Sequence, residues 1–274
     1  MRMPTFATPE PIAVSIDARN GSIRLVATDH ADTVVQVRPR DESRSADVAA
    51  AEQTRVDFRD GKLIVSGARR GMTLFRDAAV DVDIALPSRS RLHASLASAD
   101  LRAEGEFGDV RVATASGNAE VDSVTGKFKG ASASGSIAVR AVAGAASIAT
   151  ASGDVTVGDL DGDLKFKAAS GSLTVDRLSG YVKSRTASGS VEVAAAVRGG
   201  VSAHTNSGEV AVGIAEGTAV RLDIGTGSGA VSSELEPSDG PQQGDEKFAL
   251  TVRSGSGDVS IHRTKPAHEA ASAT

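Results

Sequence analysis

Hydrophobic and polar residues alternate along most of the chain, and in its second half the alternation recurs at a fixed spacing. Two columns of mostly apolar residues follow eight Ser-Gly pairs, at two and four positions after each glycine. The first column contains Ala119, Ile137, Val155, Leu173, Val191, Val210, Val231 and Val259. The second contains Val121, Val139, Val157, Val175, Val193, Val212, Ser233 and Ile261. A two-residue period rich in β-branched residues is typical of strands that bury one face.

The Ser-Gly pairs define a repeat. The first five are 18 residues apart, and the next three steps are 19, 21 and 28 residues. We assign structural turns to Ser116, Gly117, Ser134, Gly135, Ser152, Gly153, Ser170, Gly171, Ser188, Gly189, Ser207 and Gly208. Further glycines at Gly126, Gly144, Gly162 and Gly180 give each coil a second turn. We expect glycine because a tight reversal usually needs a positive φ, and serine because its hydroxyl can bond turn amides.

The second strand of each coil is less regular. It is represented by residues 127–129, 146–148, 163–167 and 181–183, where apolar residues alternate with Lys, Asp and Ser. One coil cannot bury its own apolar face, whereas stacked coils place Val over Val at about 4.8 Å. The sequence therefore predicts an all-β protein, a β-solenoid of the β-helix or β-roll type with about eight 18-residue coils of two short strands each.

The segment before the repeat also predicts strands. Candidate strands cover residues 12–16, 22–28, 33–37, 55–59, 62–66, 80–86 and 91–95, with one or two helical turns at 47–53. We interpret residues 1–92 as an irregular β region that starts or caps the stack, because a bare first strand would be an open pairing edge. Residues 93–262 are the repetitive solenoid, in which a polar excursion at 236–247 explains the 28-residue step. Residues 263–274 are predicted to be a disordered tail.

Composition narrows the classes of function. The absence of cysteine excludes disulfides, a thiol nucleophile and Cys-ligated zinc. A net charge of -5, one Tyr and no Trp give neither an electrostatic nor a stacking reason to expect nucleic acid. No segment approaches the roughly 20 apolar residues of a membrane span, and residues 1–6 lack an apolar secretory leader. We therefore expect no direct membrane insertion and, by default, a cytoplasmic location.

The repeated Ala-Ser-Gly-x-apolar-x-Val unit, preceded by Val80-Asp81-Val82-Asp83-Ile84-Ala85-Leu86-Pro87, carries a family resemblance. It resembles a bacterial family of β-strand-repeat putative adhesins, similar to the head-GIN type and regarded as a domain of unknown function. The resemblance covers residues 10–262. It implies a β-solenoid, an adhesin-like role and an association with the cell surface or with envelope stress systems. It brings no catalytic motif.

Reactive groups do not recur in register with the repeat. The hydrolase elbow Gly-x-Ser-x-Gly is missing, and the histidines His30, His93, His204, His262 and His268 show no metal-ligand spacing. The Gly-Gly-x-Gly-x-Asp repeat of calcium-binding β-rolls is also missing. Charged residues at 159–163, 176–177 and 183–185 invite comparison with polysaccharide lyases but do not recur at one aligned column. We predict no catalytic residue, no cofactor and no metal site.

The most regular candidate recognition surface is a column of hydroxyl residues two positions before the repeat serines. This hydroxyl column consists of Thr114, Ser132, Thr150, Thr186, Thr205 and Thr226. Facing outward, it would suit a repetitive ligand; facing inward, it would be a structural ladder, which we favour. The sequence thus predicts a non-catalytic binding or scaffold module for an unknown protein or glycan. A self-associating filament is the alternative, and a polysaccharide-acting enzyme is less favoured.

Overall fold

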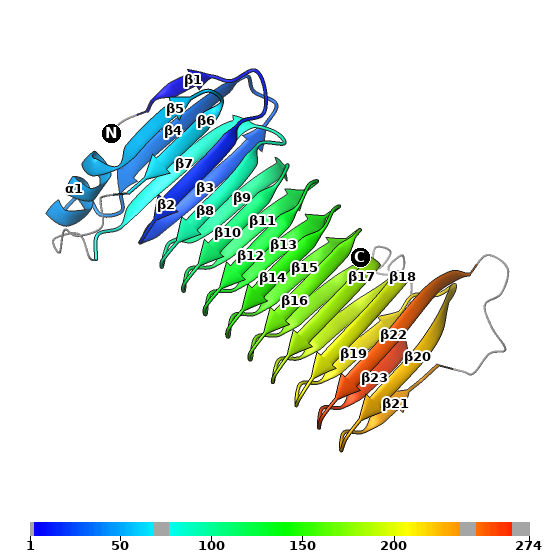
Figure 1. Cartoon of the computed structure of the whole chain (residues 1–274). Helices are drawn as coiled ribbons and strands as arrows, with labels where there is room; N and C mark the ends of the chain where they lie inside the picture. The colour runs from blue at the N-terminus through cyan, green and yellow to red at the C-terminus, as the bar shows by residue number, and fades with distance from the viewer. Residues whose placement is uncertain (1–2, 68–76, 236–244, 265–274) are drawn as a thin grey trace, which may run out of the picture. The chain divides into compact units, whose positions relative to one another are not determined.

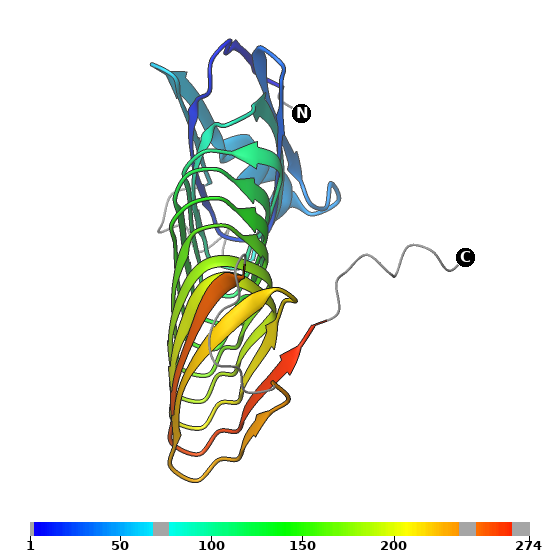
Figure 2. The ribbon, with the colours of Figure 1, turned by 90° about the vertical axis from the view of Figure 1, so that its right-hand side faces the viewer.

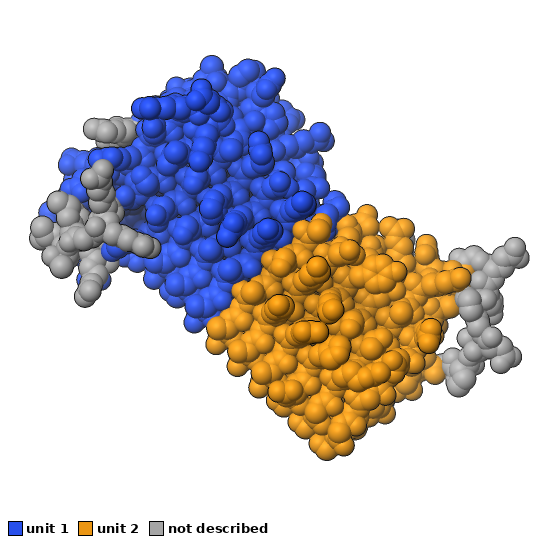
Figure 3. Space-filling view, in the orientation of Figure 1, with its two compact units in different colours: residues 1–144 blue, residues 145–274 orange. Residues whose placement is uncertain are grey.

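The structure is a computed structural model that describes residues 3–67, 77–235 and 245–264. It divides into two compact units, residues 1–144 and 145–274, which Figure 3 colours separately. In both units nearly all neighbouring strands are parallel, and partners are commonly 18 residues apart in sequence. The predicted all-β, solenoid-like architecture is therefore confirmed.

Unit 1 consists of two layers, and the strands within each layer run mostly parallel to one another (Figure 1). Its elements are β1 (Thr5–Ala7), β2 (Ala13–Ala18), β3 (Gly21–Thr28), β4 (Asp32–Pro39), α1 (Ser45–Gln53), β5 (Arg55–Arg59), β6 (Lys62–Ser66), β7 (Val80–Pro87), β8 (Arg91–Leu96), β9 (Asp100–Phe107), β10 (Val110–Thr114), β11 (Ala119–Val124), β12 (Phe128–Ser132) and β13 (Ile137–Val142). One layer has the order β6, β2, β8, β10, β12. The other has the order β7, β3, β9, β11, β13.

The seven strands expected between residues 12 and 95 are β2 to β8, and the expected helical turns are α1. Their spatial order, however, differs from their order in the chain. Strands β2 and β3 lie between β6 and β7 on one side and β8 and β9 on the other. The outer strands β6 and β7 are in turn paired antiparallel with β5 and β4. These antiparallel strands therefore cover the coil that ends the parallel stack of unit 1.

Unit 2 repeats the two-layer arrangement. Its strands are β14 (Ala146–Thr150), β15 (Val155–Leu160), β16 (Asp163–Ala168), β17 (Leu173–Thr186), β18 (Val191–Thr205), β19 (Val210–Ile214), β20 (Thr218–Thr226), β21 (Val231–Ser233), β22 (Glu246–Ser254) and β23 (Val259–Arg263). The first layer has the order β14, β16, β17, β18, β22, β20. The second has the order β15, β17, β18, β19, β23, β21. Strands β17 and β18 contribute to both layers because they continue through the corner between them.

The last coil in the chain is not the last coil of the stack. Strands β22 and β23 lie between the coil of β18 and β19 and the coil of β20 and β21 (Figure 1). The 28-residue step therefore reflects a chain that passes outward and then returns between two coils. Most of the predicted excursion (236–244) and of the predicted tail (265–274) lies outside the described residues.

The core lies between the two layers of each coil, whose curvature can be followed in Figure 2. The apolar columns predicted from the repeat are buried, except at the end coil, where Val231 is 49% exposed. The second strands contribute Phe128, Ile148 and Phe166, which are buried as fully as the first-strand residues. Burying one such side chain stabilises the folded state by about 1.5–3 kcal/mol. Because every coil buries several of them, a thin core suffices.

Candidate functional site

The hydroxyl column lies inside the turns. Thr114, Ser132, Thr150, Thr186 and Thr205 are at most 9% exposed, and Thr226 in the end coil is half-buried. Each hydroxyl bonds the backbone of a turn glycine: Thr186 Oγ1 donates to the Gly189 carbonyl over 2.7 Å, and Thr205 Oγ1 accepts from the Gly208 amide over 2.9 Å. These hydroxyls are occupied by the turn, and a ligand would reach them only by opening it.

The turn glycines are needed for close packing between coils. None of the glycines in the Ser-Gly pairs has a positive φ, contrary to our expectation, whereas the second-turn glycine Gly162 has a φ of 152°. A Cβ added to Gly189 would lie within 3.0 Å of the Gly171 carbonyl oxygen of the neighbouring coil. The same clash with a neighbouring coil recurs at Gly117, Gly135, Gly171, Gly208, Gly229 and Gly257. The serine beside each glycine is exposed, so the turn hydroxyl comes from the buried column instead.

Acidic and amide side chains after the turn glycines link successive coils. The Asp154 carboxylate accepts a hydrogen bond from the Ser172 amide over 2.9 Å, and Asp258 accepts one from the Ala230 amide over 2.8 Å. In unit 1, Asp100 and Asn118 do the same for the amides of Asn118 and Ser136. These side chains are therefore engaged in the stack. Among the described residues, no cluster of three or more His, Cys, Asp or Glu could hold a metal ion.

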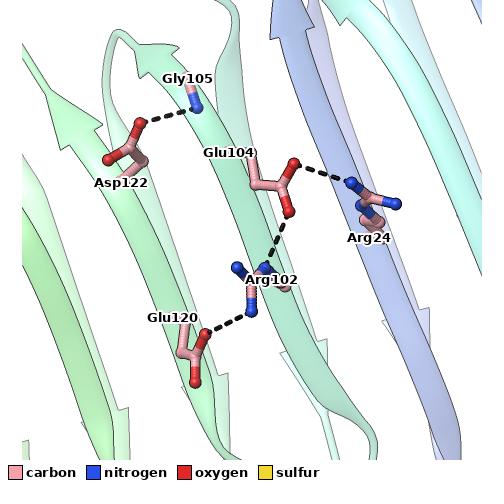
Figure 4. A network of polar contacts seen from close by, with 6 residues as sticks. All are labelled: Arg24, Arg102, Glu104, Gly105, Glu120 and Asp122. Carbon is pink, nitrogen blue, oxygen red and sulfur yellow. Dashed lines mark hydrogen bonds and ion pairs between the residues drawn. The ribbon is translucent and has the colours of Figure 1, made fainter.

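A network of ion pairs crosses the outer face of the second layer of unit 1 (Figure 4). Glu104 on β9 pairs with Arg24 on β3 at 3.0 Å and with Arg102 at 2.8 Å, and Arg102 continues to Glu120 on β11 at 3.3 Å. The hydrogen bonds from Arg24 and Arg102 lower the pKa of the Glu104 carboxyl. Charges on this face are balanced by neighbours on adjacent strands, as is usual for cross-strand pairs.

The first layer of unit 2 has a different outer surface. Lys165 and Lys167 on β16 lie directly opposite Lys183 and Arg185 on β17. All four are exposed, because the alternate residues on these strands point into the core. The pairs are separated by about 4.8 Å across strands and about 6.6 Å along them. We call these four residues the basic face; His204 on β18 extends it by one strand opposite Arg185.

The side chains of the basic face have no acidic partner among the residues that the structure describes. Asp163, two positions before Lys165, lies opposite Tyr181 and makes no ion pair with them. Beyond His204 in the same row lies Arg253, which is held by Asp223 at 2.8 and 2.9 Å. Like charges directly opposite one another destabilise a sheet, so this arrangement is not explained by folding.

An exposed aromatic ring borders the basic face. Tyr181, the only tyrosine of the chain, is 62% exposed and stands two positions before Lys183 on the same face of β17. Its neighbour on β18 is Gly200, and a Cβ built at Gly200 would lie 3.4 Å from Tyr181 Cδ1. The ring thus leans over a strand position that has no side chain. Lysine, arginine and an accessible ring lie together on one flat surface.

A cleft of about 1560 Å³ lies in unit 1, beside α1, β4 and β5. Glu42, Glu52 and Asp57 lie among its lining residues, with Val48 and Val56. Asp57 is paired with Arg59 at 3.3 Å.

Sequence reasoning found the lysines of the basic face but not their alignment. It treated Lys183 and Arg185 as part of a scattered charged set, whereas the register places them opposite Lys165 and Lys167. The signal was present as an 18-residue spacing from Lys165 to Lys183 and from Lys167 to Arg185. The exposed ring of Tyr181 adjoins these charges, which the repeat pattern did not indicate.

Stacked parallel coils, glycine corners and charged outer faces define a β-solenoid-like repeat protein. The chain belongs to the Toastrack DUF4097 family, whose profile matches residues 13–262, and the family is a domain of unknown function. The resemblance inferred from the repeat is thus confirmed. No curated protein matches the sequence. No helix among the described residues is both long and apolar enough to cross a membrane.

Three solved structures are similar in outline. They are described as a putative lipid binding protein from Parabacteroides distasonis (14% identity, TM-score 0.46), a putative adhesin from Bacteroides fragilis (12%, 0.45) and a putative cell adhesion protein from Clostridium sporogenes (9%, 0.23). The first two matches cover 96% of both chains, and the third covers 96% of this chain and 99% of the other. Because these TM-scores are low, the assignment of the chain to its family rests on the family profile.

Proposed function

We propose that this protein is a non-catalytic, adhesin-like binding module that holds an anionic partner on the basic face of unit 2. The observation that carries the proposal is the set of four exposed cations without an acidic partner, on two strands in register. Other exposed charges are paired within the fold, as the network around Glu104 shows, although Arg111 and Lys129 in unit 1 also face each other without an acidic partner among the described residues. Cations that receive no partner from the fold are available to one from outside.

The repeat supports a binding role over a catalytic one. Its recurrent polar groups, the hydroxyl column and the turn glycines, are used to build corners and stack coils. We include in the same proposal a stack of about eight such coils. We also include an association with the cell surface, which follows from the family resemblance. A stack of this kind offers long flat faces of fixed spacing, which suit a partner that is itself extended.

Binding of poly-L-glutamate tests this proposal. We expect measurable binding at about 0.05 M salt that weakens strongly toward 0.5 M, because salt screens exposed charges. The Lys165→Glu/Lys183→Glu variant should lose at least about ten-fold in affinity. The matched control is Arg55→Glu/Lys62→Glu in unit 1, which changes the net charge equally at exposed residues. Equal losses in both variants would show a general charge effect and would contradict the proposal.

Self-association is a second candidate, favoured by the end coil of unit 2. Among the described residues, β20 pairs only with β22 and β21 only with β23, and Leu222 and Val231 are 40% and 49% exposed. Such an edge can accept the same strand of a second copy. Light scattering should then show mass rising with concentration and Leu222→Glu should abolish the rise; a constant monomer mass would refute this candidate.

A further inference from the structure

The partner of the basic face can be specified further if the proposed function holds. From the grid of cations, the hydroxyls beside it and the ring of Tyr181, we infer that the basic face binds an acidic polysaccharide, a chain of sugars that each carry a carboxylate. The inference combines a charge pattern, hydrogen-bonding side chains and a stacking surface, which meet in the first layer of unit 2.

The charge pattern is a ladder with the strand spacing. Lys167 and Arg185 occupy one row across β16 and β17, and Lys165 and Lys183 occupy the next. The first row continues through the His204 side chain on β18 to Arg253 on β22, which is paired with Asp223. Successive members of a row are about 4.8 Å apart. A polymer that crosses the strands can therefore place its charged groups in step with this row.

Hydroxyl residues flank the cations in the neighbouring row. In register with Lys165 and Lys183 lie Ser147 on β14, Ser202 on β18 and Thr251 on β22. Ser202 and Thr251 are partly exposed, and neither side chain bonds another described residue. Short hydroxyl side chains can donate to and accept from sugar hydroxyls at the same site. A purely ionic site would not need them.

Tyr181 supplies the stacking surface. The residue is 62% exposed, and its ring lies against the position on the adjacent strand where Gly200 has no side chain. An aromatic ring with a wet edge can pack against the apolar face of a sugar while its hydroxyl stays in water. Tyr181 stands in the row next to Lys183, so one sugar could contact both.

Nucleic acid is less well matched to this surface. Single-stranded nucleic acid is held by several stacking rings along a basic groove, whereas this flat face has Tyr181 alone among its described residues. The net charge of -5 also opposes long-range attraction of a dense polyanion. A short local patch with one ring and flanking hydroxyls favours a sugar polymer with moderate charge density.

Polygalacturonate and its fully methyl-esterified form are the probes that test this inference, since they share a backbone and differ in charge. We expect polygalacturonate to bind and the ester to bind at least ten-fold more weakly. Tyr181→Ala should weaken polygalacturonate binding about five- to ten-fold and leave poly-L-glutamate binding unchanged. Circular dichroism melting confirms folding of each variant, and Lys165→Gln/Lys183→Gln replaces the charge-reversed variant if that variant melts early.

The outcomes separate the two proposals. Binding of poly-L-glutamate without preference for polygalacturonate, together with no effect of Tyr181→Ala, would retain the anion-binding function and overturn the polysaccharide assignment. Tighter binding of a single-stranded oligonucleotide than of polygalacturonate would overturn it as well. Failure of every polyanion to bind would overturn both.

Discussion

The repeat glycines are the residues on which the stack depends most directly. At Gly189 the backbone of the next coil occupies the space that any side chain would need. The requirement comes from the distance between coils and is independent of φ. This explains why the glycine recurs in register while residues around it vary.

Replacing Gly189 by alanine should therefore destabilise the protein by about 2 kcal/mol or more, because the added methyl forces two backbones apart. Gly225→Ala is the matched control in the same unit, since its Cβ would meet nothing closer than 3.5 Å and its φ is not positive. Urea unfolding measures both. If Gly189→Ala unfolds at the same urea concentration as Gly225→Ala, the close-packing explanation is wrong.

Ion pairs should make the free energy of unfolding depend modestly on pH in the acidic range. The pKa values of Glu104, Asp122 and Asp223 are lowered by hydrogen bonds from Arg24, Arg140 and Arg253 respectively. A carboxyl whose pKa is lower in the folded state stabilises that state fully above its unfolded pKa of about 4, and the contribution is lost as the pH falls through the folded value.

The variant Glu104→Gln should accordingly lose less stability than the wild type between pH 6 and pH 3. At pH 6 the variant should be less stable than the wild type by about 1 kcal/mol or less, since these ion pairs are solvent-exposed and screened. Urea midpoints at the two pH values provide the measurement. An identical acid dependence in the variant and the wild type would contradict a role for this carboxyl.

At the scale of elements, the chain inserts a late strand pair between two earlier coils at the end of unit 2. Strand β22 is bonded along both edges, to β18 and β20, whereas β20 is bonded along one. In unit 1, β2 and β3 are likewise enclosed, and β4 and β5 cover the outer coil. In each unit, a pair of strands is thereby held on both sides by the coils around it.

Amide hydrogen exchange should reflect this order. Amides of β22 should exchange at least about ten-fold more slowly than those of β20, because opening β22 breaks two rows of hydrogen bonds. In a serial stack the terminal strands of the chain would exchange fastest. Faster exchange in β22 than in β20 would therefore contradict the observed order.

Some elements of the fold could be predicted from the sequence and others could not. The coils were predictable because apolar residues and Gly recur in register, and β5 and β6 match their predicted bounds. The order of coils at the ends was not predictable, because every coil presents the same apolar columns to either neighbour. The basic face was missed for a related reason, since Lys165 and Lys183 become neighbours only when the second strands are paired.

At the scale of the whole molecule, four cations in register stand out on a surface that carries both signs of charge. The chain has a net charge of -5, yet the first layer of unit 2 presents Lys165, Lys167, Lys183 and Arg185. The other layer of the same unit presents Asp159, Asp176 and Glu192 among its exposed residues. A local cluster of cations on a molecule of negative net charge directs an anionic partner to one place, even with Asp163 beside it.

Lysine acetylation footprinting of the wild-type protein tests this central claim most directly. Polygalacturonate at saturating concentration should protect Lys165, Lys167 and Lys183 from acetylation, as read by mass spectrometry, while exposed Lys62 in unit 1 stays fully reactive. Raising the salt concentration should remove the protection. Protection centred on Lys62, or no difference among these four lysines, would contradict the assignment of the basic face as the binding surface.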